Sequence, residues 1–218
     1  MADTVPAQER LKDEQYGDAA RRGGAAAHPD TPIETLAEGY LPSGETVTLR
    51  LADESDIPAM LSVMHTAFAA RPALGARPAA LSETTESLAA TLAEGAGFLV
   101  LVGDEPAATM VTTRVDGVLR LSRVAVHPRF QRHGIATFAV GALLEALSEA
   151  GEESITLLSR REYPQLEQWW AVHGFARVAA QDDCWVLARR LPVVVEVPTA
   201  DEMRELGRGI ASLVRPGD

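Results

Sequence analysis

The segment from Leu121 to Leu144, LSRVAVHPRFQRHGIATFAVGALL, constrains the fold of this 218-residue chain most strongly. It has the pattern of a strand, a short loop with arginine and glycine, and a long helix. Gly134 lets the backbone approach a ligand closely. The amides from Arg132 to Thr137 would lack intrahelical acceptors, and the helix dipole adds positive charge there. The segment predicts a backbone-built phosphate or diphosphate site, although an ordinary strand-to-helix turn would show the same pattern.

Composition narrows the class of protein. The apolar fraction of 46% is that of a globular chain, and the net charge of −11 argues against a broad nucleic-acid-binding surface. The single cysteine, Cys184, excludes an internal disulfide framework. No signal peptide or membrane-length apolar run is visible, and no set of residues has metal-ligand spacing, so we expect a cytoplasmic protein without a metal.

The pattern of elements predicts one α/β domain between two extensions. Residues 1–44 are rich in Ala, Gly and Pro and are predicted to be disordered, with structure beginning near Glu45. The periodicity then predicts the order βααβββαβαβ, with a hairpin at Asp116-Gly117 and a last strand at Cys184 to Arg189. Residues 45–191 would form the domain, and residues 192–218 a strand and helix tail.

Three short motifs together resemble the GNAT family of N-acetyltransferases. The loop Gln131-Arg132-His133-Gly134-Ile135-Ala136 is similar to its Q/R-x-x-G-x-G/A loop. The segment Val124 to Pro128 resembles the strand end before that loop, and Gly174-Phe175 resembles the family's G-F pair. The resemblance covers residues 45–191. It implies the family's α/β fold, a central mixed, mostly antiparallel sheet with splayed strands, flanked by helices.

The resemblance also implies acetyl-coenzyme A as the cofactor. The pantetheine arm would pair with the backbone of Val124, Ala125 and Val126, and the loop and helix start would hold the diphosphate through Gln131, Arg132, His133, Gly134, Ile135, Ala136 and Thr137. Backbone groups carry most of these roles, so Gly134 is the sensitive side-chain position. We expect Gly134→Val to abolish coenzyme binding by steric block.

The residues expected to act on the acceptor amine depart from the family pattern. Trp170 stands where the family often has a tyrosine that protonates the departing sulfur, and Tyr163 stands at the family's asparagine position. Tyr163 is the candidate acid, although a coenzyme thiol with a pKa near 8.5 can also leave unaided. One of Trp169 and Trp170 should lie in the core and the other beside the channel; Trp170 and Glu83 are the candidate substrate-binding residues.

The tail resembles the opening of a second protein family. Thr199 and Glu202 form a capping box before an amphipathic stripe, and the chain continues to Arg215-Pro216-Gly217-Asp218. These residues resemble the start of the bacterial ATPase of tRNA threonylcarbamoyladenosine synthesis. We interpret residues 192–218 as the start of a truncated, fused ATPase domain. The alternative is a helix that docks on the domain or on a second subunit of a homodimer.

Two functions follow from these interpretations. The first is an acetyl-coenzyme A-dependent N-acetyltransferase that acts on a small-molecule or peptide primary amine by direct attack in a ternary complex. The second is a non-catalytic coenzyme A-binding regulatory or interaction module attached to a tRNA-modification ATPase. Neither calls for direct nucleic-acid binding or a membrane.

Overall fold

One twisted sheet organises the described part of the chain. The computed structural model describes residues 34–71, 78–192 and 197–213. The sheet has eight strands in the spatial order β1-β2-β3-β4-β5-β6-β8-β7. In chain order these are β1 (Thr35–Tyr40), β2 (Thr46–Ala52), β3 (Gly95–Val102), β4 (Glu105–Val115), β5 (Val118–Val126), β6 (Ser154–Arg160), β7 (Ala176–Gln181) and β8 (Cys184–Arg190). Every neighbouring pair is antiparallel except β5 and β6. The predicted α/β class with a mostly antiparallel sheet is confirmed.

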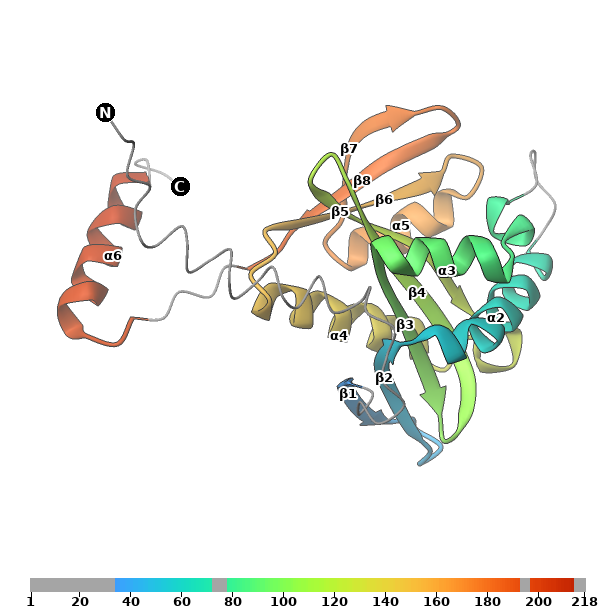
Figure 1. Ribbon diagram of the computed structural model, residues 1–218. Helices are drawn as coiled ribbons and strands as arrows, with labels where there is room; N and C mark the ends of the chain where they lie inside the picture. The colour runs from blue at the N-terminus through green and yellow to red at the C-terminus, as the bar shows by residue number, and fades with distance from the viewer. Residues whose placement is uncertain (1–33, 72–77, 193–196, 214–218) are drawn as a thin grey trace, which may run out of the picture.

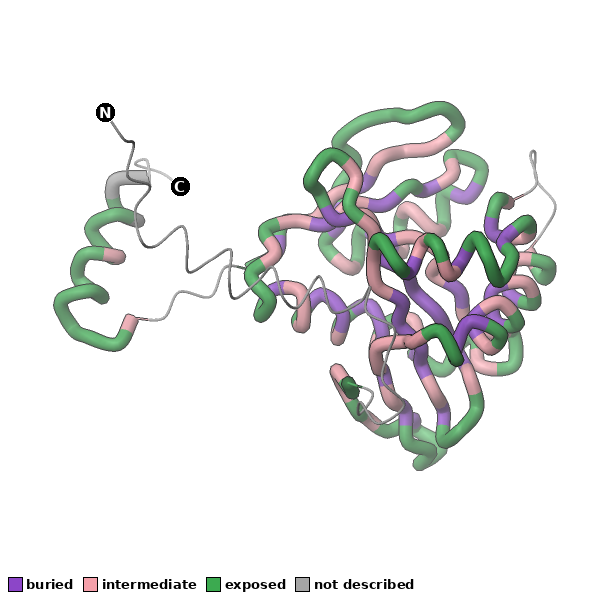
Figure 2. The backbone as a smooth tube through the Cα atoms, in the orientation of Figure 1, coloured by how far each residue is buried: buried purple, intermediate pink, exposed green. Residues whose placement is uncertain are grey.

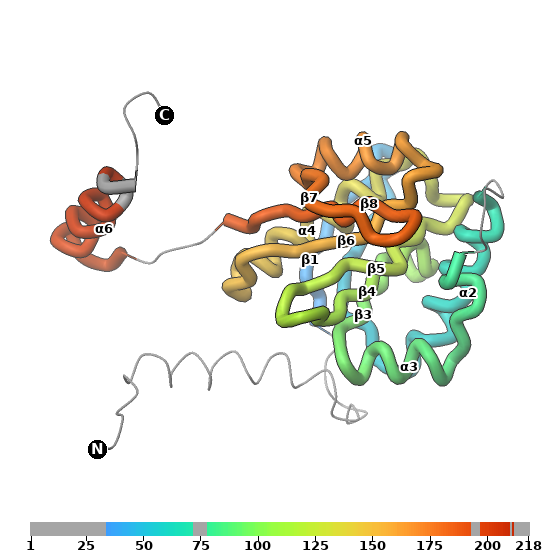
Figure 3. Tube along the Cα trace, turned by 90° about the horizontal axis from the view of Figure 1, so that it is seen from above, coloured from blue at the N-terminus to red at the C-terminus, as the bar shows by residue number. Residues whose placement is uncertain are grey.

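Helices cover both faces of the sheet (Figures 1 and 3). One face carries α2 (Ile57–Ala69) and α3 (Thr85–Glu94), and the other carries α4 (Ile135–Glu149) and α5 (Pro164–Val172). Each face has its own apolar cluster, the smaller one beneath α2 and α3. Figure 2 shows the buried residues concentrated in the central strands and in the helix sides that face them. Within the described residues, no helix is long and apolar enough to cross a membrane.

Side-chain caps stabilise the turn before α2 and the start of α3. The turn before α2, η2 (Glu54–Asp56), has a capping box between Asp53 and Asp56. Arg50 clamps the same Asp56 with two donors, at 2.6 and 2.7 Å from the carboxylate oxygens. Thr84 and Ser87 form the corresponding box at the start of α3. Each box satisfies amides that have no intrahelical acceptor.

Two strands differ from the sequence prediction. β1 pairs with β2 and precedes the predicted start of structure at Glu45, which was therefore placed too late. Its Leu36 and Ala37 pack against the core, but a six-residue strand with so few apolar residues carries little period. β7 was missed because all six of its residues are exposed, so no alternation marks it. It pairs with β8 and forms the edge of the sheet.

The C-terminal tail contains the predicted helix, α6 (Ala200–Leu213). Its capping box is present, because Thr199 N donates to Glu202 Oε2 at 3.1 Å and Glu202 N donates to Thr199 Oγ1 at 3.3 Å. The side chains described from residue 200 onward are exposed apart from the partly buried Leu206. Most of the predicted strand before this helix falls at 193–196, outside the described residues. The resemblance to an ATPase stays a prediction.

Candidate functional site

Strands β5 and β6 separate partway along their length. Their parallel pairing covers three positions and ends at Leu121 and Leu157. Beyond that point, the register between β4 and β5 shifts, so that Arg123 and Val124 stand opposite the single residue Met110. Arg123 has a φ of 50°, in the left-handed region that a β-bulge often uses. The bulge bends β5 and increases its twist, and we attribute the opening of the sheet to it.

The opening exposes one edge of β5. His127 N donates to Ala107 O of β4 at 2.8 Å. Successive residues of a strand direct their N–H and C=O groups alternately to its two sides, so every second residue before His127 faces β4. The carbonyls of Val124 and Val126 therefore point away from β4, into the opening. Side chains reach both: Gln131 Nε2 donates to Val126 O at 3.0 Å, and Arg71 Nη2 lies 3.5 Å from Val124 O. The two carbonyls of the predicted pairing edge thus lie on the side of β5 away from β4, where side chains of the same chain contact them.

The loop before α4 gathers backbone amides. Arg132 and Gly134 have φ values of 67° and 81°, so left-handed residues alternate along the loop. Such alternation turns successive N–H groups toward one side and makes an anion-binding concavity. The helix's own bonding begins with Phe138 N to Gly134 O at 2.9 Å, which leaves the three amides before Phe138 without intrahelical acceptors. The loop therefore has the donors that a diphosphate requires.

A cavity of about 310 Å³ lies at this loop. Its lining includes seven of the ten predicted coenzyme-contacting residues together with two aromatic side chains: Val126, Gln131, Arg132, Gly134, Ile135, Ala136, Thr137, Phe130 and Trp169. Of the other three, Val124 offers its carbonyl to the opening, Ala125 is buried on the α2 and α3 side, and His133 is exposed. The structure thus brings most of the predicted residues together around one cavity.

The two tryptophans of α5 have different positions. Trp170 is 7% exposed and belongs to the main core, with its ring 5.2 Å from that of Phe175. Trp169 lines the cavity and meets Trp170 edge-on, 4.7 Å between centroids. Trp170 was predicted to contact substrate, and its burial does not support that role. Trp169 lies at the cavity wall instead. The sequence did not separate the two tryptophans, because helical spacing alone does not tell which of two adjacent residues faces the core.

Tyr163 and Arg71 come together on the other side of the opening. Tyr163 is 5% exposed and precedes α5, and its phenol interacts electrostatically with Arg71. Burial lowers the pKa of Arg71, and the interaction with Tyr163 partly opposes that effect. Arg71 therefore interacts both with Tyr163 and with the carbonyl of Val124 on β5. Sequence reasoning missed Arg71, which follows the last turn of α2 without any motif.

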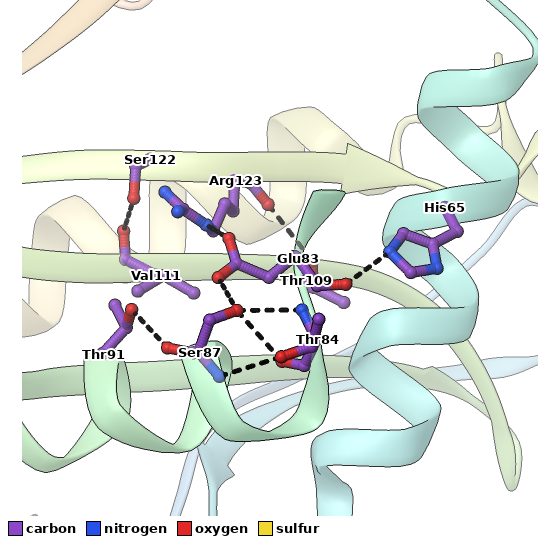
Figure 4. Close-up of polar contacts among 9 residues, drawn as sticks. All are labelled: His65, Glu83, Thr84, Ser87, Thr91, Thr109, Val111, Ser122 and Arg123. Carbon is purple, nitrogen blue, oxygen red and sulfur yellow. Dashed lines mark hydrogen bonds and ion pairs between the residues drawn. The ribbon is translucent and has the colours of Figure 1, made fainter. Parts of the chain in front are cut away.

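Glu83 is occupied by the protein itself (Figure 4). Its Oε2 accepts from Arg123 Nε, and its Oε1 accepts from Ser87 Oγ at 2.6 Å. Thr109 Oγ1 donates to the carbonyl of Arg123 at 3.1 Å, and a ring nitrogen of His65 lies 3.1 Å from the carbonyl of Glu83. The carboxylate is 5% exposed, so it fixes the bulge instead of offering an open contact to a substrate. The predicted substrate contact at Glu83 is not supported.

The family profile described as Acetyltransferase (GNAT) domain matches residues 38–164. None of the curated proteins matches.

Solved structures share the fold at low identity. The PaiA N-acetyltransferase of Thermoplasma acidophilum, in complex with coenzyme A, is 10% identical, with a TM-score of 0.58 over 66% of this chain and 98% of that chain. The ribosomal-protein-S18-alanine N-acetyltransferase of Escherichia coli is 18% identical, with a TM-score of 0.57 over 70% and 99%. The putative acetyltransferase yncA of Salmonella typhimurium, with acetyl-coenzyme A, is 16% identical, with a TM-score of 0.54 over 71% and 98%. At these identities the likeness shows the fold alone.

Proposed function

Because this chain belongs to the GNAT family of acetyltransferases, we propose that it transfers an acetyl group from acetyl-coenzyme A to a primary amine. The amine would attack directly, within a ternary complex. The observation that carries the proposal is the junction of the anion-binding loop, the cavity and the exposed edge of β5. Two of the similar structures named above are complexes with coenzyme A or acetyl-coenzyme A, which supports the choice of donor.

The described residues fit the parts of such a donor. The amides of the loop and of the first turn of α4 suit the diphosphate. The carbonyls of Val124 and Val126 suit the peptide-like amides of the pantetheine arm, which would extend the sheet edge. Gln131 would have to release Val126 when the arm binds. Acetyl-coenzyme A would supply an activated acetyl thioester at the opening between β5 and β6.

Tyr163 is the proposed general acid. Its phenol is buried and interacts with Arg71, whose guanidinium lies at the carbonyl of Val124 on β5. A phenol O–H at that place can hold a proton and donate it to the departing sulfur. Trp170 does not take this role, because its indole N–H is not an acid near neutral pH and the ring is in the core.

Release of free thiol from acetyl-coenzyme A tests the proposal. With a panel of primary amines, we expect amine-dependent thiol release above hydrolysis. Tyr163→Phe should lower kcat by about 100-fold, the usual size of a general acid's contribution, with little change in coenzyme A affinity. The absence of amine-dependent release with every acceptor would contradict acetyl transfer. Full activity of Tyr163→Phe would contradict the role of Tyr163 alone.

We keep the tail as a separate proposal, the start of a second unit. Its support is the capping box of α6 and the exposure of the helix. Pro192, by contrast, still belongs to the domain, because Ser148 Oγ donates to its carbonyl at 2.6 Å. A chain that ends at Pro192 should therefore keep its melting temperature. A large decrease would show that the tail is part of the acetyltransferase domain.

A further inference from the structure

Arg71 has no carboxylate partner among the described residues, unlike the arginine of β2 and the arginine of the β5 bulge. Arg50 pairs with Asp56, and Arg123 pairs with Glu83. Arg71 contacts the ring of Phe68 and the carbonyl of Val124, and its charge interacts electrostatically with Tyr163. The adjoining segment 72–77, Pro-Ala-Leu-Gly-Ala-Arg, lies outside the described residues and contains no acidic residue.

The position of Arg71 is fixed by apolar contact. Its guanidinium lies over the Phe68 ring, 4.0 Å from the centroid, and the residue is partly buried. A guanidinium has five N–H donors, whereas the polar bond described here is a single contact at 3.5 Å, the outer limit of a hydrogen bond. Phe68 thus holds a cation beside the exposed edge of β5, and among the described residues this cation has a single polar side-chain bond.

Donor binding would remove even that weak contact. Under the proposed function, the carbonyl of Val124 pairs with the pantetheine arm, and Arg71 is left without its acceptor. Arginine stays charged at neutral pH, and a partly buried charge without a counter-charge is unfavourable. Arg71 would then need an anion as its partner. With the donor bound, the acceptor substrate is the molecule that could supply this anion.

We propose that Arg71 binds a carboxylate of the acceptor, so that the substrate is a primary amine that also carries a carboxylate. The proposal rests on the proposed function, because it assigns the acceptor of that same site. One guanidinium matches one carboxylate through two parallel N–H···O bonds. Arg123, the arginine of the β5 bulge, is neutralised by Glu83, so a dianionic phosphate beside Arg71 would meet too few free charges. Arg71 is thereby a specificity-determining residue.

Matched acceptors separate this role from a structural one. Glycine, β-alanine and γ-aminobutyrate are compared with their carboxamides, in which the same amine lacks the negative charge. The readout is kcat/KM for thiol release by the wild type, Arg71→Gln and Arg71→Lys. Arg114→Gln is the matched control, because Arg114 is 48% exposed at the far end of β4 and pairs with Glu152. Coenzyme A affinity of each variant reports that it is folded.

We expect the wild type to prefer the carboxylates, and Arg71→Gln to lose about 10- to 100-fold on them, the size of a charge-assisted hydrogen bond. Arg71→Gln should change little on the carboxamides, Arg71→Lys should keep part of the preference, and Arg114→Gln should keep all of it. Equal rates on carboxylates and carboxamides in the wild type, or a preference that survives in Arg71→Gln, would overturn the proposal.

A binding measurement distinguishes the failure of this inference from the failure of acetyl transfer. If no acceptor releases thiol, acetyl transfer is wrong, and the same acceptors are titrated by calorimetry into the protein loaded with coenzyme A. Carboxylate binding that is lost in Arg71→Gln and kept in Arg114→Gln would still support the anion site. Binding that does not depend on Arg71 would overturn it.

Discussion

Two glycines at and near the start of α4 should respond oppositely to the same substitution. Gly134 has a φ of 81°, and Gly141 lies within the helix; apart from the adjacent residues and the helix's own backbone, a Cβ at either position would meet no protein atom within 4 Å. Packing therefore contributes to neither change, and backbone conformation decides both. In Gly134→Ala, the left-handed conformation costs about 1–2 kcal/mol. The reduced freedom of the unfolded chain returns about 0.4–1 kcal/mol, so the net loss is about 1 kcal/mol.

At Gly141, within the helix, the expected change in stability has the opposite sign. Gly141→Ala should raise the free energy of unfolding by about 1 kcal/mol, because alanine is the better helix former. The two variants should thus differ by about 2 kcal/mol, roughly a 30-fold difference in the unfolding equilibrium. Urea denaturation followed by circular dichroism measures both, and equal slopes would show that the unfolded state is unchanged. A Gly134→Ala protein as stable as Gly141→Ala would refute the left-handed start of the anion-binding loop.

Four further substitutions test other parts of the site and the core. Trp170→Ala should cost about 3–5 kcal/mol as a core deletion, whereas Trp169→Ala should mainly weaken coenzyme A binding; equal losses of stability would contradict their different positions. Burial tends to raise the pKa of Asp56, but its arginine partner outweighs this, and the pKa lies below the usual range. The stabilisation is then present above about pH 4 and lost as the pH falls through the lowered pKa, so Asp56→Asn should cost about 2 kcal/mol at neutral pH and little in strong acid. If urea titrations gave the same loss of stability for Asp56→Asn at every pH, the lowered pKa of Asp56 would be contradicted. Glu83→Gln should cost about 2 kcal/mol in thermal unfolding, less than for a fully buried pair because Arg123 is 28% exposed; no loss would mean that the pair does not stabilise the bulge.

The residues of the proposed donor site could be predicted from the sequence because their proposed function lies in the backbone. A glycine after a strand and before a helix indicates a left-handed residue and free amides, and the structure has both at Gly134. The acceptor half depends on side chains that tertiary packing brings together. Arg71 and Tyr163 are far apart in the chain, and no local pattern indicates that they meet.

The errors in the fold prediction have similarly physical causes. The exposed strand β7 has no apolar face to create a period, and β1 follows a segment of Ala, Gly and Pro that resembles a linker. Trp169 and Trp170 are adjacent in α5, and the spacing of apolar residues does not define the orientation of the helix precisely enough to tell which of them faces the core. The left-handed conformation of Arg123 follows from the bulge and its bond to Glu83, and arginine itself does not favour it.

Calorimetric titration of coenzyme A tests the central claim, a coenzyme site at the start of α4, most directly. The wild type should bind one equivalent, and Gly141→Ala should bind with unchanged affinity. Gly134→Val should lose binding, because its side chain would point into space that the structure leaves free of protein atoms. No binding by the wild type, or equal affinity in Gly134→Val and Gly141→Ala, would contradict the account.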